Sequence, residues 1–199
     1  MKNMPDCAAS SPYEIRIAGA GGQGIVLAGI LLAEAALASG SYVAQTQSYG
    51  AETRGGSSVS DVVISTSAID YPKAVRLDIL VALTQEACDQ NLSDMKEDGL
   101  VIVDADLVKH ALWSRTVSLP LARIARQSGE ERAANMAALG AVAAFCPTVK
   151  LASLFSAMRK RLTPSRFEAN RAACEEAHKL AARISVCPEQ VAVREDYEP

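Results

Sequence analysis

A short apolar strand that runs into a turn of closely spaced glycines constrains the fold of this chain most. The strand covers residues 13–18, and an apolar helix is predicted over residues 23–39. Because glycine has no Cβ atom, the turn between them can adopt unusual dihedral angles and let a ligand or another backbone approach closely. An anion or a polar group of a partner would satisfy the first amides of the helix. The glycines of the turn are Gly19, Gly21, Gly22 and Gly24, and three of them follow the G-x-G-x-x-G spacing.

Strands and helices alternate along the chain, which predicts an α/β fold with a Rossmann-like, mostly parallel sheet flanked by helices. We expect a flexible N-terminus over residues 1–12, a single α/β domain over residues 13–190 that is helical from about residue 120, and a flexible tail over residues 191–199. Thr84 is a predicted N-cap, and Ser128 with Glu131 has the spacing of a capping box. The other predicted strands cover residues 42–46, 59–64, 78–83, 100–103 and 116–119, and the other predicted helices cover residues 85–94, 121–127, 130–145, 149–162 and 164–184.

The composition argues against several classes of function. The 199 residues carry a net charge of -3 and the basic residues are dispersed, so we expect neither nucleic acid nor a membrane as a partner. Residues 1–12 lack the apolar core of a secretory signal, which favours a cytoplasmic location. The cysteines form no C-x-x-C pair, and this favours reduced, buried thiols over a disulfide framework, a cluster or a zinc site. They are Cys7, Cys88, Cys146, Cys174 and Cys187.

A polar, glycine-rich loop follows the second predicted strand. It runs from residue 48 to residue 58 and holds an aromatic, an acidic and a basic side chain close together in Tyr49, Glu52 and Arg54. The loop leaves the carboxyl end of the second strand and the glycine turn leaves the carboxyl end of the first. Both are therefore expected at the edge where open α/β sheets bind ligands. The alternative is a plain surface connection whose charged side chains are solvated.

A dinucleotide is one candidate ligand of the glycine turn. In NAD-binding Rossmann units, an acidic residue at the end of the second strand binds the ribose hydroxyls. Here the predicted strand ends in Gln45, Thr46 and Gln47, which are neutral. The neutral ending argues against NAD.

No catalytic residue is predicted in this chain. The sequence has no nucleophile elbow, no H-E-x-x-H motif and no P-loop lysine. His110 and His178 lie among charged neighbours and are expected to be solvated. Asp104 and Asp106 follow a predicted strand, but a metal would need further oxygen ligands, so a solvated turn is the expected structure.

Several segments together resemble the gamma subunit of the 2-oxoacid:ferredoxin oxidoreductases of the 2-oxoglutarate, ketoisovalerate or pyruvate type. The glycine turn alone is a weak signal, but joined in this order and at this distance to a Tyr-Gly-x-Glu-x-Arg-Gly-Gly loop it is fairly specific. The Tyr-Gly-Ala-Glu form of the loop is similar to the 2-oxoglutarate and branched-chain members rather than to the indolepyruvate members. The resemblance covers about residues 14–180 and rests on residues 19–24, 48–56, 69–72, 78–83, 101–104 and 135–140.

The resemblance implies a role inside a larger enzyme. Such enzymes oxidatively decarboxylate a 2-oxoacid to an acyl-CoA with thiamine diphosphate, and they pass electrons through iron-sulfur clusters to ferredoxin. Because the ligands of the thiamine diphosphate and the clusters lie chiefly on other subunits, this chain alone is expected to bind no cofactor and to be inactive. Its expected partners are the alpha and beta subunits, with a delta subunit as a further candidate.

On this interpretation, the glycine turn and the loop form a docking surface against the thiamine-bearing subunits and help to close the active site. Arg54 would offer a forked cation to a carboxylate or a phosphate. Two alternatives stay open: a free-standing Rossmann-like nucleotide-binding module with its ligand at the glycine turn, and a scaffold without active-site contacts. The candidate cofactor-binding residues are Gly19, Gly21, Gly22, Gln23, Gly24, Tyr49, Glu52, Arg54, Gly55 and Gly56.

Overall fold

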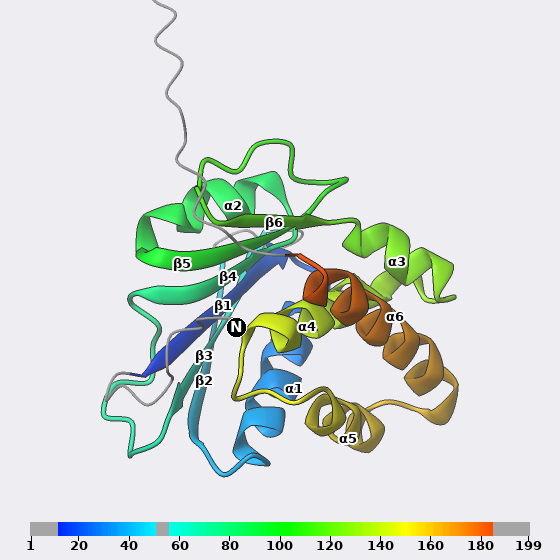
Figure 1. Ribbon diagram of the computed structural model, residues 1–199, viewed down its shortest axis with the longest axis horizontal. Coiled ribbons are helices and arrows are strands. Elements are labelled where there is room, and N and C mark those ends of the chain that lie inside the picture. The colour runs from blue at the N-terminus through cyan, green and yellow to red at the C-terminus, as the bar shows by residue number, and fades with distance from the viewer. Residues whose placement is uncertain (1–11, 51–55, 185–199) are drawn as a thin grey trace, which may run out of the picture.

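Six strands form one mixed sheet at the centre of the molecule. The structure, a computed structural model, describes residues 12–50 and 56–184. The strands are β1 (Tyr13–Ala20), β2 (Tyr42–Tyr49), β3 (Ser57–Ser65), β4 (Leu77–Ala82), β5 (Met95–Asp104) and β6 (Thr116–Leu119). They lie side by side in the order β2-β3-β1-β4-β5-β6 (Figure 1).

The two halves of the sheet differ in strand direction. β1, β4, β5 and β6 are parallel, whereas β3 pairs antiparallel with β1 on one side and with β2 on the other. β2 therefore runs parallel to β1 with β3 inserted between them. A connection as short as residues 50–56 joins β2 to β3 as an antiparallel hairpin, because a parallel pair needs a crossover of a dozen residues or more.

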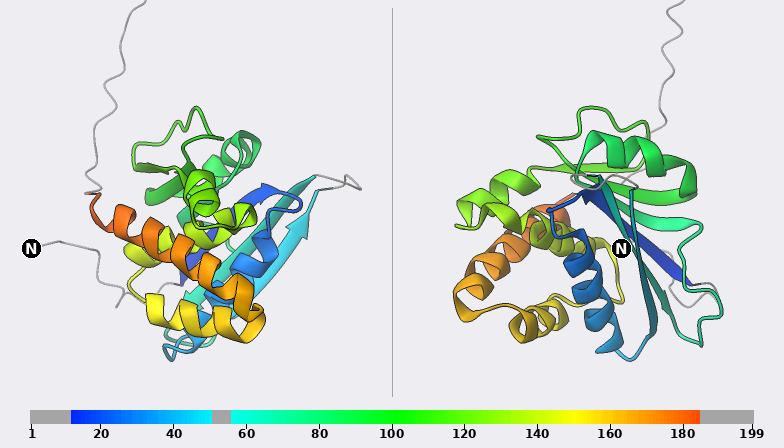
Figure 2. Two further views of the ribbon diagram at one scale, coloured as in Figure 1. Left: turned by 90° about the vertical axis from the view of Figure 1, so that its right-hand side faces the viewer. Right: turned by 180° about the vertical axis from the view of Figure 1, so that it is seen from behind.

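Helices cover both faces of the sheet, and the coverage is unequal (Figures 1 and 2). The larger apolar core joins one face of the sheet to α1 and to the C-terminal helices, and the smaller core joins the other face to α2. The α/β fold with a helical C-terminal part, predicted from the sequence, is confirmed. The α-helices are α1 (Ile25–Leu37), α2 (Gln85–Asn91), α3 (Leu121–Gln127), α4 (Ala134–Phe145), α5 (Leu151–Arg161) and α6 (Pro164–Ala182).

Two glycines let buried elements approach closely on the larger core. A Cβ atom on Gly29 of α1 would lie 1.9 Å from the Oγ atom of Ser60 in β3. A Cβ atom on Gly140 of α4 would lie 1.9 Å from the carbonyl oxygen of Cys174 in α6. α1 therefore rests directly on the sheet, and α4 and α6 touch through their backbones.

Arg16 of β1 lies on the face of the sheet that carries the smaller core, and its guanidinium donates hydrogen bonds to four residues outside β1. Its Nε atom donates to Asp61 Oδ1 at 2.7 Å, and its second terminal nitrogen donates to Asp61 Oδ2 and to the Ala74 carbonyl, each at 3.1 Å. The remaining nitrogen donates to Asn91 Oδ1 at 3.1 Å and to Asp94 Oδ2 at 2.5 Å. This cation therefore links β1, β3 and the end of α2.

Several local predictions are confirmed and others are wrong. Thr84 is the N-cap of α2, with its hydroxyl accepting from the Ala87 amide at 3.2 Å. The capping box is wrong: Ser128 ends α3, and its hydroxyl donates to the Ile124 carbonyl at 2.9 Å. A 3-10 turn (Glu131–Ala133) separates it from α4. The competing bond inside α3 removes Ser128 from the next helix.

Three of the cysteines have buried thiols, as the sequence predicted for a reduced chain. Cys88, Cys146 and Cys174 lie in the two cores, whereas Cys7 and Cys187 lie outside the described residues. No helix in residues 12–50 or 56–184 is long and apolar enough to cross a membrane.

Cys174 should resist alkylation in the folded chain. Burial, with a smaller effect of the Glu175 charge, raises the pKa of its thiol from 9.0 to about 12. Mass spectrometry after iodoacetamide treatment at about pH 8.5 should find Cys174 unmodified in native protein and modified in denaturant. Above the unfolded pKa the unfolded thiol loses its proton while the folded thiol keeps it, so this group lowers stability as pH rises past 9.0 toward 12. Equal labelling of native and denatured chains would contradict the buried position.

Candidate functional site

The glycine turn joins the end of β1 to the start of α1 at the carboxyl edge of the parallel strands. Gly19 lies within β1 and pairs with Ser58 of β3. Gly22 and Gly24 have positive φ angles of 90° and 70°, which favour glycine. A Cβ atom on Gly22 would meet no atom of the described residues within 4 Å, so glycine is favoured there by its φ angle, whereas a Cβ atom on Gly24 would collide with a neighbouring side chain.

The turn and the polar loop meet, as the sequence predicted. The Gly21 amide donates to the Gly56 carbonyl at 2.9 Å, and the Gly50 amide donates to the Ser57 carbonyl at 2.7 Å. Tyr49 ends β2 with its side chain 65% exposed. The structure thus places Tyr49 and Gly56 of the loop at the edge that holds the glycine turn. Glu52, Arg54 and Gly55 lie outside the described residues.

Gln23 folds back into the turn that its neighbours form. Its Oε1 atom accepts from the Ala20 amide at 2.7 Å, and its Nε2 atom lies 3.5 Å from the Leu83 carbonyl at the end of β4. A Cβ atom on Gly19 would lie 2.3 Å from that Oε1 atom. The first glycine of the motif therefore makes room for a side chain of this protein, which explains its presence without a bound phosphate.

Asn135 of α4 reaches the same turn, although it is not among the site residues predicted from the sequence. Its Nδ2 atom donates to the Gly24 carbonyl at 2.9 Å. The sequence signal that marks it is a polar side chain in an apolar helix; the structure leaves it only 3% exposed. The contact joins residues 111 positions apart, which no local pattern encodes.

The predicted end of the second strand was wrong. β2 continues to Tyr49, so Gln45 and Gln47 lie inside the strand instead of at its carboxyl end. The Gln45 Nε2 atom donates to Ser60 Oγ at 2.9 Å and to the Thr46 carbonyl at 3.0 Å. Pairing with β3 lengthens the strand past the polar residues. The neutral residues Gln45, Thr46 and Gln47 therefore do not occupy the strand end at which NAD-binding units carry an acidic residue, and they are not evidence against NAD.

The Asp104 turn is also different from the expected solvated turn. Asp104 is fully buried; its Oδ1 atom accepts from the Asp106 amide at 2.8 Å and its Oδ2 atom accepts from the Ala122 amide at 2.7 Å. It fastens the start of α3 to the end of β5. Asp106 pairs with Arg123, which is the main cause that lowers the pKa of the Asp106 carboxyl. Among the described residues, no three His, Cys, Asp or Glu side chains are grouped to hold a metal.

The two histidines have different surroundings. The side chain of His110 is exposed, while its backbone amide donates to Gln85 Oε1 at 3.1 Å. His178 is half-buried, and its Nδ1 atom lies 3.2 Å from the Gly140 carbonyl. The prediction of a solvated side chain was wrong for His178, because α6 packs against α4 at that point.

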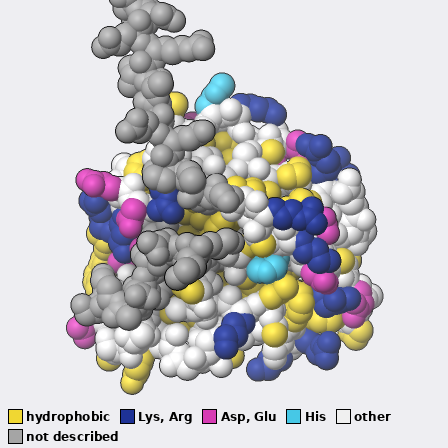
Figure 3. All heavy atoms as spheres, in the orientation of Figure 1, with side chains coloured by type: hydrophobic (Ala, Val, Ile, Leu, Met, Phe, Trp, Pro, Cys, Tyr) yellow, Lys and Arg dark blue, Asp and Glu magenta, His cyan; other side chains and the backbone are white. Residues whose placement is uncertain are grey.

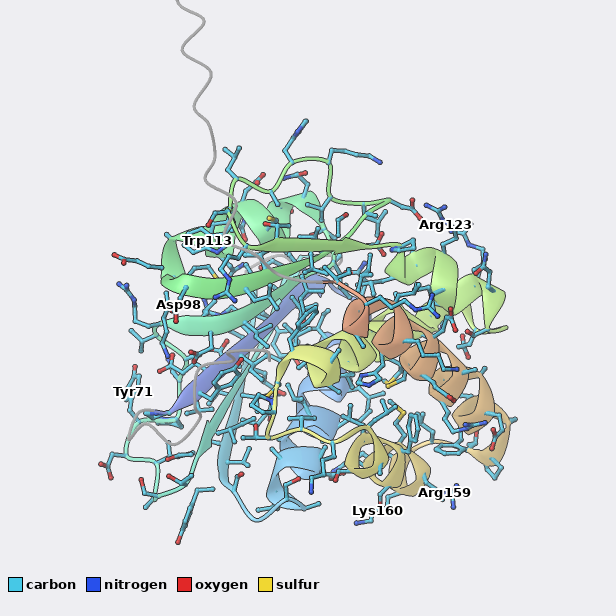
Figure 4. The ribbon with its side chains drawn as sticks, in the orientation of Figure 1. Tyr71, Asp98, Trp113, Arg123, Arg159 and Lys160 are labelled. Atoms are coloured by element: carbon cyan, nitrogen blue, oxygen red, sulfur yellow. The ribbon has the colours of Figure 1, made fainter. Side chains whose placement is uncertain are left out.

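Basic side chains gather over the helical layer, and acidic neighbours pair with many of them (Figure 3). Figure 4 marks Arg123 on α3 and Arg159 and Lys160 on α5, all on this layer. The ion pairs there are Arg123–Asp106, Arg161–Glu34, Arg166–Glu130, Arg171–Glu168, Arg171–Glu175 and Lys179–Glu175. Much of the positive charge is therefore neutralised within the molecule, and the sheet edge stays the candidate site.

The glycine edge, which is the carboxyl edge of the parallel strands around the glycine turn, offers backbone groups and a few polar side chains to a ligand or a partner. Among the described residues, no side chain caps the N-terminus of α1, so this edge suits an anion or a polar backbone segment. The Gln23 side chain occupies part of the turn. The arrangement fits recognition of a partner better than bond-breaking chemistry.

Comparison with known proteins gives consistent similarities. A family model described as pyruvate ferredoxin/flavodoxin oxidoreductase matches residues 14–180. A 2-oxoglutarate synthase subunit, KorC of Methanocaldococcus jannaschii, is 40% identical over 86% of this chain and 95% of its own length. Ketoisovalerate oxidoreductase subunit VorA of Methanothermobacter marburgensis is 39% identical over 65% of this chain and 28% of its own length.

A solved structure is similar over most of the chain. It is the gamma subunit of a keto/oxoacid ferredoxin oxidoreductase from Geobacter sulfurreducens, with a TM-score of 0.74 and 40% identity. The match covers 85% of this chain and 98% of that one. The similarity therefore extends through both the sheet and the C-terminal helices.

Proposed function

Because the chain belongs to the pyruvate ferredoxin/flavodoxin oxidoreductase family, we propose that it is the gamma subunit of a thiamine-diphosphate-dependent 2-oxoacid:ferredoxin oxidoreductase. The observation that carries the proposal is 40% identity across 95% of the length of a KorC subunit. The similar gamma subunit from Geobacter sulfurreducens supports the same assignment. The assembled enzyme would convert a 2-oxoacid to an acyl-CoA and deliver electrons to ferredoxin.

The names of the relatives support a substrate class. The similar chains are named for 2-oxoglutarate and for ketoisovalerate, a branched-chain 2-oxoacid. We propose 2-oxoglutarate or a branched-chain 2-oxoacid as the substrate of the complex. Alpha and beta subunits, with a delta subunit as a further candidate, would complete it.

The cofactors of the complex would lie on those other subunits. Iron-sulfur clusters are held by cysteine thiolates, yet Cys88, Cys146 and Cys174 lie in the cores and are not grouped as ligands within the described residues. The residues of this part of the chain therefore do not fit a cluster. Thiamine diphosphate and CoA would supply decarboxylation and acyl transfer in the complex.

The contribution of this chain would be a docking surface at the glycine edge. Gly21 and Gly56 bond to one another, and Tyr49 stands exposed beside them. This surface, residues 19–24 with 49–56, would contact the thiamine-bearing subunits and help to close their active site. Aromatic and arginine side chains are enriched at such interfaces, which fits Tyr49 and Arg54.

Replacing Arg54 with alanine should weaken the complex. The expected result is a loss of about tenfold or more in 2-oxoacid-dependent viologen reduction, since a forked cation facing a carboxylate or phosphate contributes on the order of 1.5–3 kcal/mol. Lys160→Ala removes the same charge from an exposed position on α5 (Figure 4) and should change nothing. Unchanged turnover and unchanged assembly in Arg54→Ala would remove Arg54 from the interface.

A free-standing nucleotide-binding module is the alternative function. It predicts that the isolated chain binds NAD, FAD or CoA tightly in a calorimetric titration. The gamma-subunit proposal predicts no tight binding by the isolated chain. Gln23, which lies across the turn and bonds to Ala20, favours the second result.

A further inference from the structure

The N-terminus of α1 is held by a side chain from a distant helix instead of by a local cap. Gly24 occupies the N-cap position in the left-handed conformation, and no side chain of residues 12–50 or 56–184 caps the helix amides. Its carbonyl accepts from the Ala28 amide at 3.0 Å, as the first bond of α1. The same carbonyl also accepts from Asn135 Nδ2 at 2.9 Å.

Both ends of the Asn135 amide are bonded. While Nδ2 bonds to Gly24, Oδ1 accepts from the Met136 amide at 2.9 Å. The side chain is only 3% exposed, so water does not compete with these bonds. A buried amide that loses its partner is costly, and the pair therefore fixes the distance between α4 and the turn.

Gly24 and Asn135 are also matched in shape. A Cβ atom on Gly24 would lie 2.4 Å from Asn135 Nδ2. The last glycine of the G-x-G-x-x-G pattern is thus required twice, once for its positive φ angle and once for the approach of this amide. Neither reason involves a bound nucleotide.

The position of α4 is itself set by α6. Gly140, one and a half turns beyond Asn135, lies against the backbone of Cys174, and its carbonyl is within 3.2 Å of His178 Nδ1. The Asn135-Met-Ala-Ala-Leu-Gly140 segment therefore touches the glycine turn at one end and α6 at the other. Through it the C-terminal helices reach the edge of the sheet.

We infer that Asn135 is a positioning residue, which acts through Gly24 to hold the glycine turn in the shape that the docking surface needs. The inference rests on the proposed gamma-subunit function for its consequence, although the hold on the turn is a property of this chain alone. An asparagine fits this position because its buried Nδ2 donates to the second lone pair of the Gly24 carbonyl, which also accepts from the Ala28 amide. A carboxylate of the same size would place an acceptor against it.

The test is hydrogen exchange in the full chain carrying Asn135→Asp. Amides of residues 20–28 should exchange about tenfold faster or more, because the loss of one buried bond on the order of 1.4 kcal/mol opens the turn. The matched control is Asn170→Asp, another buried amide, which donates to the Arg166 carbonyl at 2.7 Å inside α6. It should leave residues 20–28 unchanged. Equal exchange there in both variants overturns the inference.

A second pair of variants, in which alanine replaces asparagine, keeps the test possible if the charged variant does not fold. If Asn135→Asp fails to fold, Asn135→Ala and Asn170→Ala replace the charged variants, with the same expected difference at residues 20–28. A turn that exchanges at the wild-type rate in folded Asn135→Ala contradicts the positioning role.

Assays of the complex separate this inference from the proposed function. In these assays the chain is titrated into the partner subunits. The Asn135→Asp chain should reach half-maximal turnover at about tenfold higher concentration than the wild-type chain, with the same maximal rate. If the variant exchanges faster at residues 20–28 but reaches half-maximal turnover at the wild-type concentration, the shape of the turn does not affect docking. If the wild-type chain does not stimulate turnover, the proposed function fails, while the exchange result still decides whether Asn135 holds the turn.

Discussion

Replacing Arg16 with methionine should lower the free energy of unfolding by about 3–5 kcal/mol, because a buried carboxylate loses its cation. The side chains of Arg16 and Asp61 are only 12% and 10% exposed. Burial by itself would lower the pKa of Arg16, but hydrogen bonds and charges from Asp61 and Asp94 outweigh it and raise the pKa. The cation is therefore bound into the fold, and Asp61 and Asn91 both lose a donor in the variant.

Urea unfolding, monitored by circular dichroism, measures this loss of stability. Arg123→Met is the matched control, since Arg123 pairs with Asp106 on the surface, where the side chains are 56% and 37% exposed. Exposed pairs contribute little, so the control midpoint should stay close to that of the wild type. Arg16→Met with Asp61→Leu should recover most of the loss, because the unpaired charge is gone. Equal midpoints for Arg16→Met and Arg123→Met would contradict the network.

Replacing Gly140 with alanine should destabilise the chain by about 3 kcal/mol, near the upper end for overpacked sites. The added Cβ atom would lie 1.9 Å from the carbonyl oxygen of Cys174, and a backbone atom cannot move aside as the end of a side chain can. Helix propensity alone predicts the opposite sign, a gain of about 1 kcal/mol. The sign of the measured change thus distinguishes close packing of α4 on α6 from an ordinary helix interior.

Gly40→Ala provides the comparison for Gly140→Ala. Gly40 has a φ angle of 88°, and a Cβ atom there would meet no atom within 4 Å in the part of the chain that the structure describes. Its replacement should cost about 1 kcal/mol, from backbone strain alone. A smaller loss for Gly140→Ala than for Gly40→Ala in thermal unfolding would mean that α4 and α6 are not in backbone contact.

Much of the fold could be predicted because local patterns determine it. The strands β1, β4 and β6 and the cap at Thr84 could be predicted from neighbouring residues, and the structure confirms them. β5 was predicted only over its apolar residues 100–103, whereas it begins at Met95. The end of β2 could not be read, since pairing with β3 extends a strand past Gln45 and Gln47. The sequence predicts a solvated turn at Asp104 and Asp106, yet Asp104 is buried and accepts a hydrogen bond from the distant Ala122 amide.

The candidate site divides in the same way. The meeting of the turn with the loop follows from strand direction, and the bond from Gly21 to Gly56 agrees with it. The reach of Gln23 toward Leu83 and of Asn135 to Gly24 spans 60 and 111 positions. Such contacts depend on how the helices pack, and the hydrophobic periodicity of the sequence does not predict that packing. The glycine spacing is therefore explained largely by this chain's own side chains.

Comparing the larger subunits with and without this chain tests the central claim most directly. The measurement is CoA-dependent viologen reduction with 2-oxoglutarate or a branched-chain 2-oxoacid, by co-purified alpha and beta subunits to which the chain is added. If the chain is the gamma subunit, turnover should rise about tenfold or more and reach a plateau as the chain saturates its partners. Turnover that is the same without the chain, together with no association between the chain and those subunits, would contradict the assignment.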